Sequence, residues 1–412
     1  MQTRSKTQPL STKSNTIWNA AGCFFYLGCQ WLTTILVVLL SSNYENSGVL
    51  AFAMSTGNMF AAVGLYKIRT FQVSDVNSEY SPNDYAGFRI LTIAVSAIAT
   101  IIFLVLGTGL NAFTIASIVY LLFKADETFN DVFFGIEQKA FRMDYIGKSQ
   151  FLRGIATIVG FSVPLAICDS LLASILGMAA LCISITFFYD RRNATLFGFT
   201  KPSISKKNVI RLVRACFLPT VANLLATSIV SMARQQYGIT NGEEMLGIYA
   251  SIATPAVLVQ AAATYLYSPL IGRLAQTLSN IGLHQFRKSL IKTIMGMIAV
   301  ITVICLLVSN VGIWGLPILF GKEIEAYVWI FPFVLISTGC IALLYFTNDM
   351  LIIIRKGVPQ LAINSIALIS SLTLLGPLTN MCSMNGINLA IIIGSSLATI
   401  LGISYICFNR KL

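Results

Sequence analysis

The sequence predicts an all-α polytopic membrane protein with about twelve transmembrane helices and little soluble structure. Two observations predict this class. First, the composition is 56% hydrophobic and only 11% charged, with a mean hydropathy of +0.77, so the chain cannot cover itself with polar surface. Second, apolar runs of about 20 residues recur along the chain, which is the length a helix needs to cross a bilayer core. These runs are continuous rather than alternating, so they indicate helices and not barrel strands.

The loops between the predicted spans alternate in charge. With both termini cytoplasmic, all but three of the 28 basic residues fall on the inner side. Lys124 falls within a span, and Arg234 and Lys322 fall outside. Topology therefore explains most of the net charge of +12, and no nucleic-acid partner is expected. The predicted spans cover residues 17–41, 48–66, 87–109, 112–135, 151–167, 170–189, 209–233, 245–267, 289–309, 326–354, 360–379 and 386–408.

A polar, basic stretch near the middle of the chain divides the spans into two sets of six. We predict a cytoplasmic N-terminal tail of residues 1–16, an N-lobe of residues 17–189, a cytoplasmic linker of residues 190–208 and a C-lobe of residues 209–412. An even number of spans in each lobe predicts parallel repeats about an axis along the membrane normal. The nine cysteines form no CxxC pair and the chain has one histidine, so no metal and no other cofactor is expected.

The fourth predicted span is the most informative because it carries charges near the bilayer midplane. An unpaired charge at that depth costs at least about 2.5–3.5 kcal/mol, and such residues usually face a bundle interior or an aqueous cavity. Lys124 can therefore line a transport cavity, or it can pair with Glu127 one turn away and only staple the bundle. At 100° per residue, the polar residues form two adjacent strips, Lys124, Glu127, Asp131 and Gln138 on one and Asp126, Asn130 and Glu137 on the other.

Other polar residues within spans are weaker candidates for a substrate cavity. Asn19 and Gln30 lie on one face of the first span, and Asn223 and Arg234 lie on one face of the seventh. Hydrogen bonds between helices explain the amides equally well. Arg234, near the outer end of its span, either contacts an anionic substrate or extends to the interface.

Three basic residues lie at cytoplasmic helix ends, namely Lys67, Arg69 and Arg153. Their position is typical of topology signals. The same position also suits contact with a lipid phosphate at a cytoplasmic mouth.

Extended stretches of the sequence resemble a known family. They are NTIWNAAGCFFYLGCQWLTTILVV, SSNYENSGVLAFAMSTGN and YKIRTFQVSDVNSEYSPNDY within residues 15–89, and KADETFNDVFFGIEQKAFRMDYIGKSQFLRG at residues 124–154. Residues 246–276 match more loosely. The chain resembles the Wzx-type polysaccharide repeat-unit flippases, in the polysaccharide-export branch of the MOP superfamily of multidrug, oligosaccharidyl-lipid and polysaccharide exporters. The resemblance rests on extended similarity, because this family has no short catalytic signature.

The resemblance implies a MATE-like fold and a transport function without catalysis. Such proteins flip undecaprenyl-pyrophosphate-linked oligosaccharides across the bacterial cytoplasmic membrane by alternating access, for capsule, O-antigen or exopolysaccharide synthesis. Membrane lipids and the polymerase and glycosyltransferases of the same pathway are the implied partners. Lys124 and Arg234 become candidates for the substrate cavity. Asp126, Glu127 and Asp131 make a purely cationic cavity doubtful and are candidates for proton or sodium coupling.

Two other classes of function remain open at this point. A multidrug or lipid II exporter of the same superfamily would share the fold, and the acidic residues of the fourth span suit a carrier of organic cations. A membrane polysaccharide polymerase also uses about a dozen spans. That enzyme typically carries a large outer loop, whereas the outer connections predicted here are short.

Overall fold

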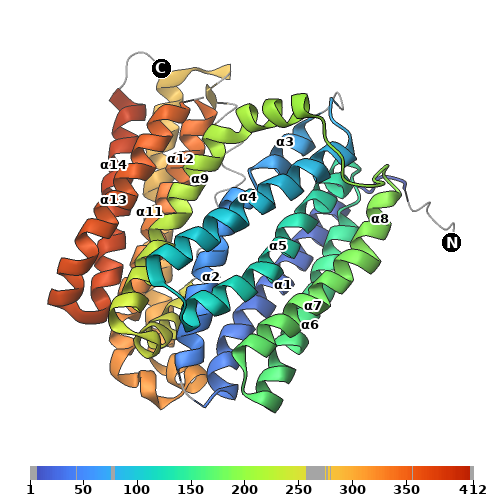
Figure 1. The fold of residues 1–412 in the computed structure, drawn as a ribbon. Helices are drawn as coiled ribbons and strands as arrows, with labels where there is room; N and C mark the ends of the chain where they lie inside the picture. The colour runs from blue at the N-terminus through green and yellow to red at the C-terminus, as the bar shows by residue number, and fades with distance from the viewer. Residues whose placement is uncertain are drawn as a thin grey trace. The chain divides into compact units, whose positions relative to one another are not determined.

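The computed structural model describes residues 7–42, 44–75, 79–256, 274, 277–278, 280–354 and 356–408. Within these ranges the chain is predominantly helical and has no β-strand, which confirms the predicted all-α class (Figure 1). The chain divides into two compact units, Met1–Thr220 (unit 1) and Val221–Leu412 (unit 2). The boundary lies within a long helix, next to Pro219.

Unit 1 contains eight helices, a π-helical segment and the first part of a ninth helix. The elements are α1 (Thr12–Leu40), α2 (Glu45–Gly64), α3 (Ile68–Ser74), α4 (Pro82–Thr108), α5 (Ala112–Lys139), α6 (Met143–Cys168), α7 (Leu171–Ile185), η1 (Thr186–Asp190), α8 (Arg191–Thr195) and α9 (Lys206–Asn241), which continues into unit 2. Helix α1 packs along α6, and α6 packs along α7. Helix α5 is central, since α2, α3, α4 and α7 all pack against it.

Unit 2 contains the rest of α9, a helical stretch at residues 243–256 and a C-terminal helical group. The named elements of that group are α11 (Leu283–Phe320), η2 (Lys322–Ile330), α12 (Phe331–Ile353), α13 (Gly357–Cys382), η3 (Ser383–Asn385) and α14 (Gly386–Phe408). Helix α14 packs against both α13 and α12, and α11 packs against α12.

Short polar side chains start several helices of unit 1 by satisfying N–H groups that lack a partner within the helix. Ser81 and Asp84 form a reciprocal capping box at the start of α4, with Pro82 in the first turn. The side chain of Asn111 accepts a hydrogen bond from the backbone of Thr114 and so caps α5. These caps fix the starts of the two helices that carry Arg89 and Lys124.

The described helices agree with the predicted spans. Nine stretches of the described chain are long and apolar enough to cross a membrane, and the last of them, Gly357–Phe408, contains both α13 and α14. Helix α5 is long enough but carries too many charges to be counted among these nine. Of the eighth predicted span, residues 257–267 lie outside the described residues. So do residues 1–6 and 409–412, Arg273 and Arg355.

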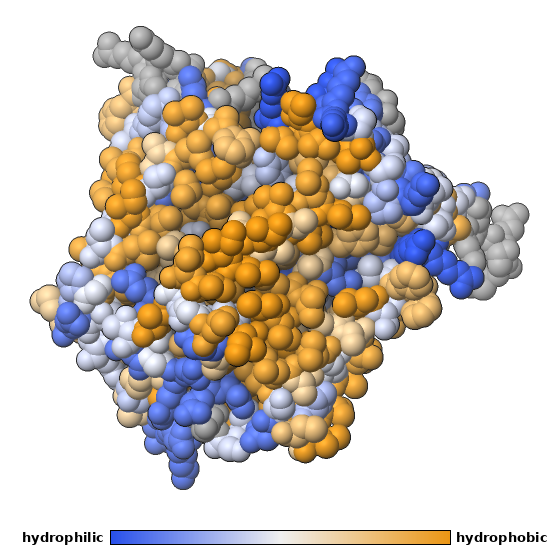
Figure 2. Space-filling view, in the orientation of Figure 1, coloured by the Kyte–Doolittle hydropathy of each residue, from blue (hydrophilic) through white to orange (hydrophobic). Residues whose placement is uncertain are grey.

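Large apolar side chains are exposed on several helices. On α4, Ile98 and Leu106 are 60% and 82% exposed, and on α11 Trp314 is 79% exposed. Figure 2 shows such orange residues spread over the visible face, with blue polar residues mainly toward its edges. Soluble monomers rarely expose apolar patches of this kind, whereas a bilayer solvates them.

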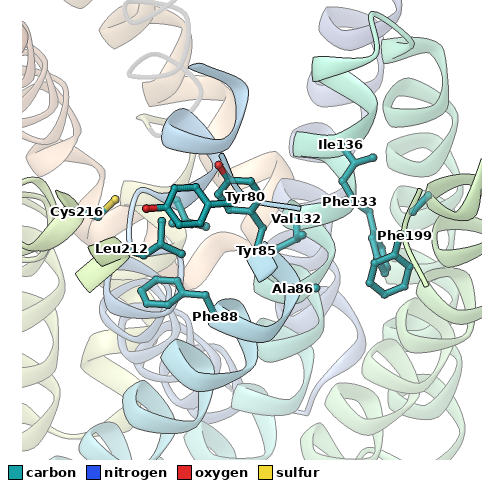
Figure 3. Packing of buried hydrophobic residues seen from close by; sticks show 12 residues of the cluster. Tyr80, Tyr85, Ala86, Phe88, Val132, Phe133, Ile136, Phe199, Leu212 and Cys216 are labelled. Atoms are coloured by element: carbon teal, nitrogen blue, oxygen red, sulfur yellow. The ribbon is translucent and has the colours of Figure 1, made fainter. Parts of the chain in front are cut away.

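The predicted linker of residues 190–208 is packed against unit 1. Phe199 is buried with residues of α3, α4, α5, α8 and α9 in an aromatic-rich cluster, where its ring lies 5.0 Å from that of Phe133 (Figure 3). Asn83, at the start of α4, fixes the same segment. Its Nδ2 donates to Thr200 Oγ1, and its backbone carbonyl accepts from the N–H of Ser203. The start of α9 is therefore anchored to unit 1.

Glycine permits a close approach of α6 and α7. A Cβ added at Gly160 would lie 2.7 Å from the carbonyl oxygen of Gly177, a backbone atom that cannot move alone. Small residues allow such approach between membrane helices. We expect Gly160→Ala to lower the free energy of unfolding by about 1–3 kcal/mol. The matched control is Gly28→Ala in α1, where a Cβ meets nothing within 4 Å. Thermal unfolding in detergent compares the two variants, and equal midpoints would contradict the expectation.

Candidate functional site

Helix α5 carries a polar stripe along one face of unit 1. Lys124 Nζ lies 2.6 Å from Glu127 Oε2, one turn further along the helix. From α1, Tyr26 OH and Gln30 Nε2 donate to Glu127 Oε1 over 3.1 and 3.3 Å. The Glu127 side chain is 30% exposed, so this group of residues reaches the surface of unit 1.

A cavity lies beside the Lys124–Glu127 pair. Three of its lining side chains are polar, namely Gln30, Thr33 and Thr157, and the others are apolar or aromatic. The rings of Phe123 and Tyr120 belong to this lining, and their centroids lie 5.8 and 6.0 Å from Lys124 Nζ. An ammonium group at this distance is attracted by an aromatic face. The cavity lining therefore combines amide and hydroxyl groups with aromatic surface, and Lys124 lies near two of its rings without lining it.

Asp131, one turn beyond Glu127, is shared by two arginines. Arg69 Nη1 of α3 lies 3.1 Å from Asp131 Oδ1, and Arg89 Nη2 of α4 lies 2.8 Å from Oδ2. Arg89 is fully buried, whereas the Arg69 side chain is 29% exposed and also binds Gln138 Oε1. Two cations against one carboxylate leave a net positive charge at this end of the stripe.

The turn after α3 is anchored by Asp75, which helps to position that helix. Its carboxylate accepts hydrogen bonds from the N–H groups of Glu79 and Tyr80 and from the hydroxyl of Tyr85, and Lys139 Nζ lies 3.9 Å away. Burial raises the pKa of Asp75, but these hydrogen bonds and Lys139 together outweigh burial and lower the pKa below its ordinary value. Asp75 therefore stays ionised at neutral pH.

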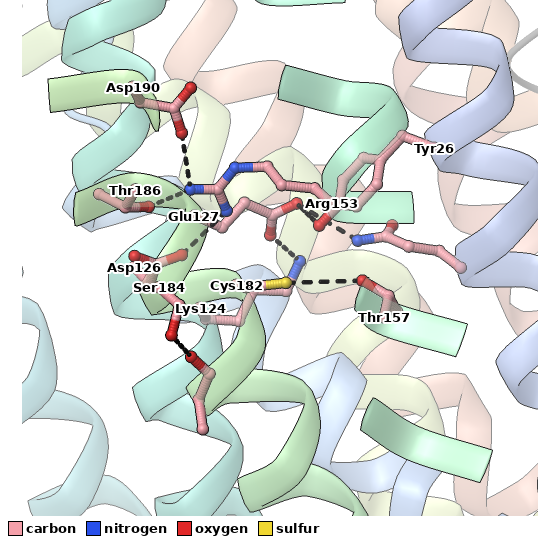
Figure 4. A network of polar contacts seen from close by, with 12 residues as sticks. Tyr26, Lys124, Asp126, Glu127, Arg153, Thr157, Cys182, Ser184, Thr186 and Asp190 are labelled. Carbon is pink, nitrogen blue, oxygen red and sulfur yellow. Dashed lines mark hydrogen bonds and ion pairs between the residues drawn. The ribbon is translucent and has the colours of Figure 1, made fainter. Parts of the chain in front are cut away.

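The second polar strip of α5 is buried and joins an ion network (Figure 4). Arg153 of α6 is 2% exposed, and its Nη1 lies 2.9 Å from Asp126 Oδ2. Its Nη2 lies 3.4 Å from Asp190 Oδ2 and also donates to the hydroxyl of Thr186, both on η1. One guanidinium thus links α5, α6 and η1, because its planar fork can serve several acceptors.

The other residues predicted in this lobe lie apart from the network. Asn19 is half-buried on α1, and its Oδ1 accepts a weak hydrogen bond from Cys23 Sγ at 3.9 Å. Lys67 is exposed in the turn between α2 and α3, where its φ of 51° is left-handed. Arg153, by contrast, is buried against its two carboxylates and lies on no exposed surface.

The structure adds two residues that sequence reasoning did not place in the site. Arg89, near the start of the third predicted span, is one of the basic residues on the predicted inner side, and Asp190 is the first residue of the predicted linker. Arg89 stands within the first turns of α4 beside an otherwise apolar run, which is a usable signal. No sequence signal links Asp190 to Arg153, since they are 37 residues apart.

Two predicted residues belong to unit 2. Asn223 is half-buried on α9. Arg234, also half-buried on α9, has its guanidinium 5.9 Å from the centre of the Tyr249 ring. Tyr249 OH donates to Asn388 Oδ1 over 3.0 Å, so Arg234 stands at the edge of a buried polar cluster. Its predicted contact with substrate stays a prediction.

The fold is similar to that of several solved transporters. The lipid II flippase MurJ in an inward closed conformation matches with a TM-score of 0.65 and 13% identity over 96% of this chain and 88% of that chain. An inward-facing multidrug resistance MATE transporter of the MOP superfamily matches with a TM-score of 0.64 and 14% identity, over 91% and 93% of the two chains. The chain has a MATE-like fold.

A mutant of the MATE transporter VcmN from Vibrio cholerae matches with a TM-score of 0.56 and 11% identity, over 94% of each chain. No protein-family model matches the sequence, and no curated protein sequence matches it. At these identities the solved structures establish the fold and not the substrate.

Proposed function

We propose that this protein flips undecaprenyl-pyrophosphate-linked oligosaccharide repeat units across the bacterial cytoplasmic membrane, by alternating access, for capsule, O-antigen or exopolysaccharide synthesis. The observation that carries the proposal is the accessible polar stripe of α5, which stands in an apolar helical unit of MATE-like fold. A stripe of charged and amide groups at membrane depth suits a cargo with a charged, sugar-bearing head.

The charges of the stripe suit a pyrophosphate. Lys124, Arg69 and Arg89 face two carboxylates, those of Glu127 and Asp131, so the stripe carries one net positive charge. A phosphate oxygen can replace a carboxylate oxygen at Lys124 or Arg69, because both anions accept the same charge-assisted hydrogen bonds. The ion pairs satisfy the cations until substrate arrives.

The neutral groups of the stripe suit a glycan. Gln30 offers an amide, and Tyr26 offers a hydroxyl and an aromatic face. Sugar hydroxyls need partners that both donate and accept, which amides provide. The resemblance to Wzx-type flippases supports the same cargo. The solved neighbours include a lipid II flippase and multidrug transporters, which keeps lipid II and organic cations as alternative substrates.

The decisive experiment is a leaflet assay. Inverted membrane vesicles receive the strain's radiolabelled, undecaprenyl-pyrophosphate-linked repeat unit, and the label that becomes protected in the lumen is counted. We expect protection to require the protein and to fall at least about tenfold in Lys124→Ala, which corresponds to about 1.4 kcal/mol of lost interaction. The matched control is Lys13→Ala, an exposed lysine near the N-terminus.

Parallel vesicles receive lipid II or a fluorescent organic cation. Protection of the repeat unit equal to that of empty-vector vesicles, together with transport of either alternative probe, would overturn the proposed substrate. If Lys124→Ala kept full activity, the proposed function would stand, and the role of Lys124 would be limited to its structural ion pair with Glu127.

The proposal also places the protein in a pathway and a compartment. Glycosyltransferases must supply the lipid-linked unit on the cytoplasmic face, and a polymerase must consume it on the outer face. Those enzymes are the proposed partners, and the proposed location is the bacterial cytoplasmic membrane. The exposed apolar helices support a multi-pass membrane location.

A further inference from the structure

Glu137 is the one carboxylate of α5 that has no partner among the described residues. It is 0% exposed, and neither Oε1 nor Oε2 has a hydrogen-bond partner there. The other three carboxylates of the helix each contact a cation within 3.1 Å, namely Asp126 with Arg153, Glu127 with Lys124 and Asp131 with Arg69 and Arg89. Glu137 therefore needs a separate explanation.

The surroundings of Glu137 disfavour a negative charge. Asp190 of η1 and Asp144 of α6 lie near enough to repel it, and Tyr189 of η1 is a further titratable neighbour. The two nearby cations are already bound elsewhere, Arg69 to Asp131 on α5 and Arg142, which precedes α6, to Asp144 over 2.8 Å. A buried carboxylate without a partner takes up a proton, because isolated burial of its charge is very costly.

We propose that Glu137 is a proton-binding site that holds a neutral carboxyl group in this conformation. Its ionisation releases one proton and leaves one negative charge at the buried end of α5. The three residues that the sequence suggested for ion coupling are ion-paired, and Glu137 takes that role in their place.

A chain of charges connects Glu137 to the polar stripe. Asp190, its acidic neighbour, lies 3.4 Å from Arg153, whose stronger contact is Asp126 at 2.9 Å. Negative charge on Glu137 draws Arg153 toward η1 and weakens its hold on Asp126, which is next to Glu127 in α5. The coupling of this proton to transport rests on the proposed function, whereas the protonation itself does not.

Infrared spectroscopy of the purified protein tests the protonation without any transport substrate. A protonated carboxyl group has a carbonyl stretching band separate from the amide and carboxylate bands, and the band shifts in D2O. At neutral pH we expect the band in the wild type and in Glu79→Gln, which changes an exposed glutamate, and its loss in Glu137→Gln. Glu137→Asp, which keeps a carboxyl group, should retain a displaced band if Glu137→Gln fails to fold.

Two results would overturn the site. One is a wild-type spectrum without the band, or with a band that survives Glu137→Gln. The other is loss of the wild-type band when sodium chloride replaces choline chloride at constant pH, since that would identify a sodium site. A flipping assay that fails while the band behaves as expected would count against the proposed function alone.

Discussion

Replacing Arg153 with methionine should lower the free energy of unfolding of the protein by about 3–5 kcal/mol, the cost of removing one member of a buried ion pair. Methionine keeps an unbranched stem of the same length as far as Nε, so the packing of the stem is retained and the guanidinium end is removed. It leaves Asp126 and Asp190 facing each other without the guanidinium that joins them. Unfolding by titration with denaturing detergent measures the change.

Arg192→Met is the matched control, because Arg192 is exposed on α8 and enters none of the described ion pairs. The triple variant Arg153→Met, Asp126→Asn, Asp190→Asn removes the stranded charges and should recover most of the loss. If Arg153→Met unfolded at the same detergent fraction as Arg192→Met, the network would contribute nothing to stability.

The helical periodicity of α5 predicted the arrangement of its polar residues in two strips. It separated Lys124, Glu127 and Asp131 from Asp126, Asn130 and Glu137. In the structure Glu127 and Asp131 of the first strip are partly exposed, whereas Lys124 and all three residues of the second strip are buried. Spacing within one helix is enough to separate the two strips, because each residue turns the side-chain direction by about 100° around the helix axis. The spacing does not predict which strip faces the interior of the helical unit, because both strips contain carboxylates.

Partners from other helices were beyond the sequence. Arg153 was placed at a cytoplasmic helix end as a topology signal, and its burial against Asp126 and Asp190 depends on how α6 and η1 pack on α5. The same holds for Arg89, which reaches Asp131 across 42 residues of chain. The distribution of basic residues predicts the orientation of the chain in the membrane, but it does not predict which charged side chains form ion pairs.

The contacts of the predicted linker were likewise beyond the sequence. Composition marks residues 190–208 as a polar linker, and the contacts of Phe199 and Asn83 attach that segment to unit 1. The compact units divide later, between Thr220 and Val221 within α9. Composition marks this segment as polar, but it does not predict the ring contact of Phe199 or the hydrogen bonds with Asn83.

Exchanging the charges of the Lys124–Glu127 pair should distinguish a structural role of the ion pair from a role of Lys124 in substrate binding. Lys124→Glu alone places two carboxylates one turn apart and should destabilise the protein, since like charges at this spacing repel. The double variant Lys124→Glu, Glu127→Lys restores an ion pair with the opposite order along α5. We expect its detergent unfolding midpoint to return near that of the wild type.

Flipping by the double variant should remain at least about tenfold below the wild type, because the cation has moved one turn away from the aromatic rings of Tyr120 and Phe123. The leaflet assay with the radiolabelled repeat unit measures this at equal protein level. If stability and flipping both recovered, the ion pair would have a structural role only. Recovery of stability without flipping requires the positive charge at residue 124 itself, as expected of a group that receives the pyrophosphate.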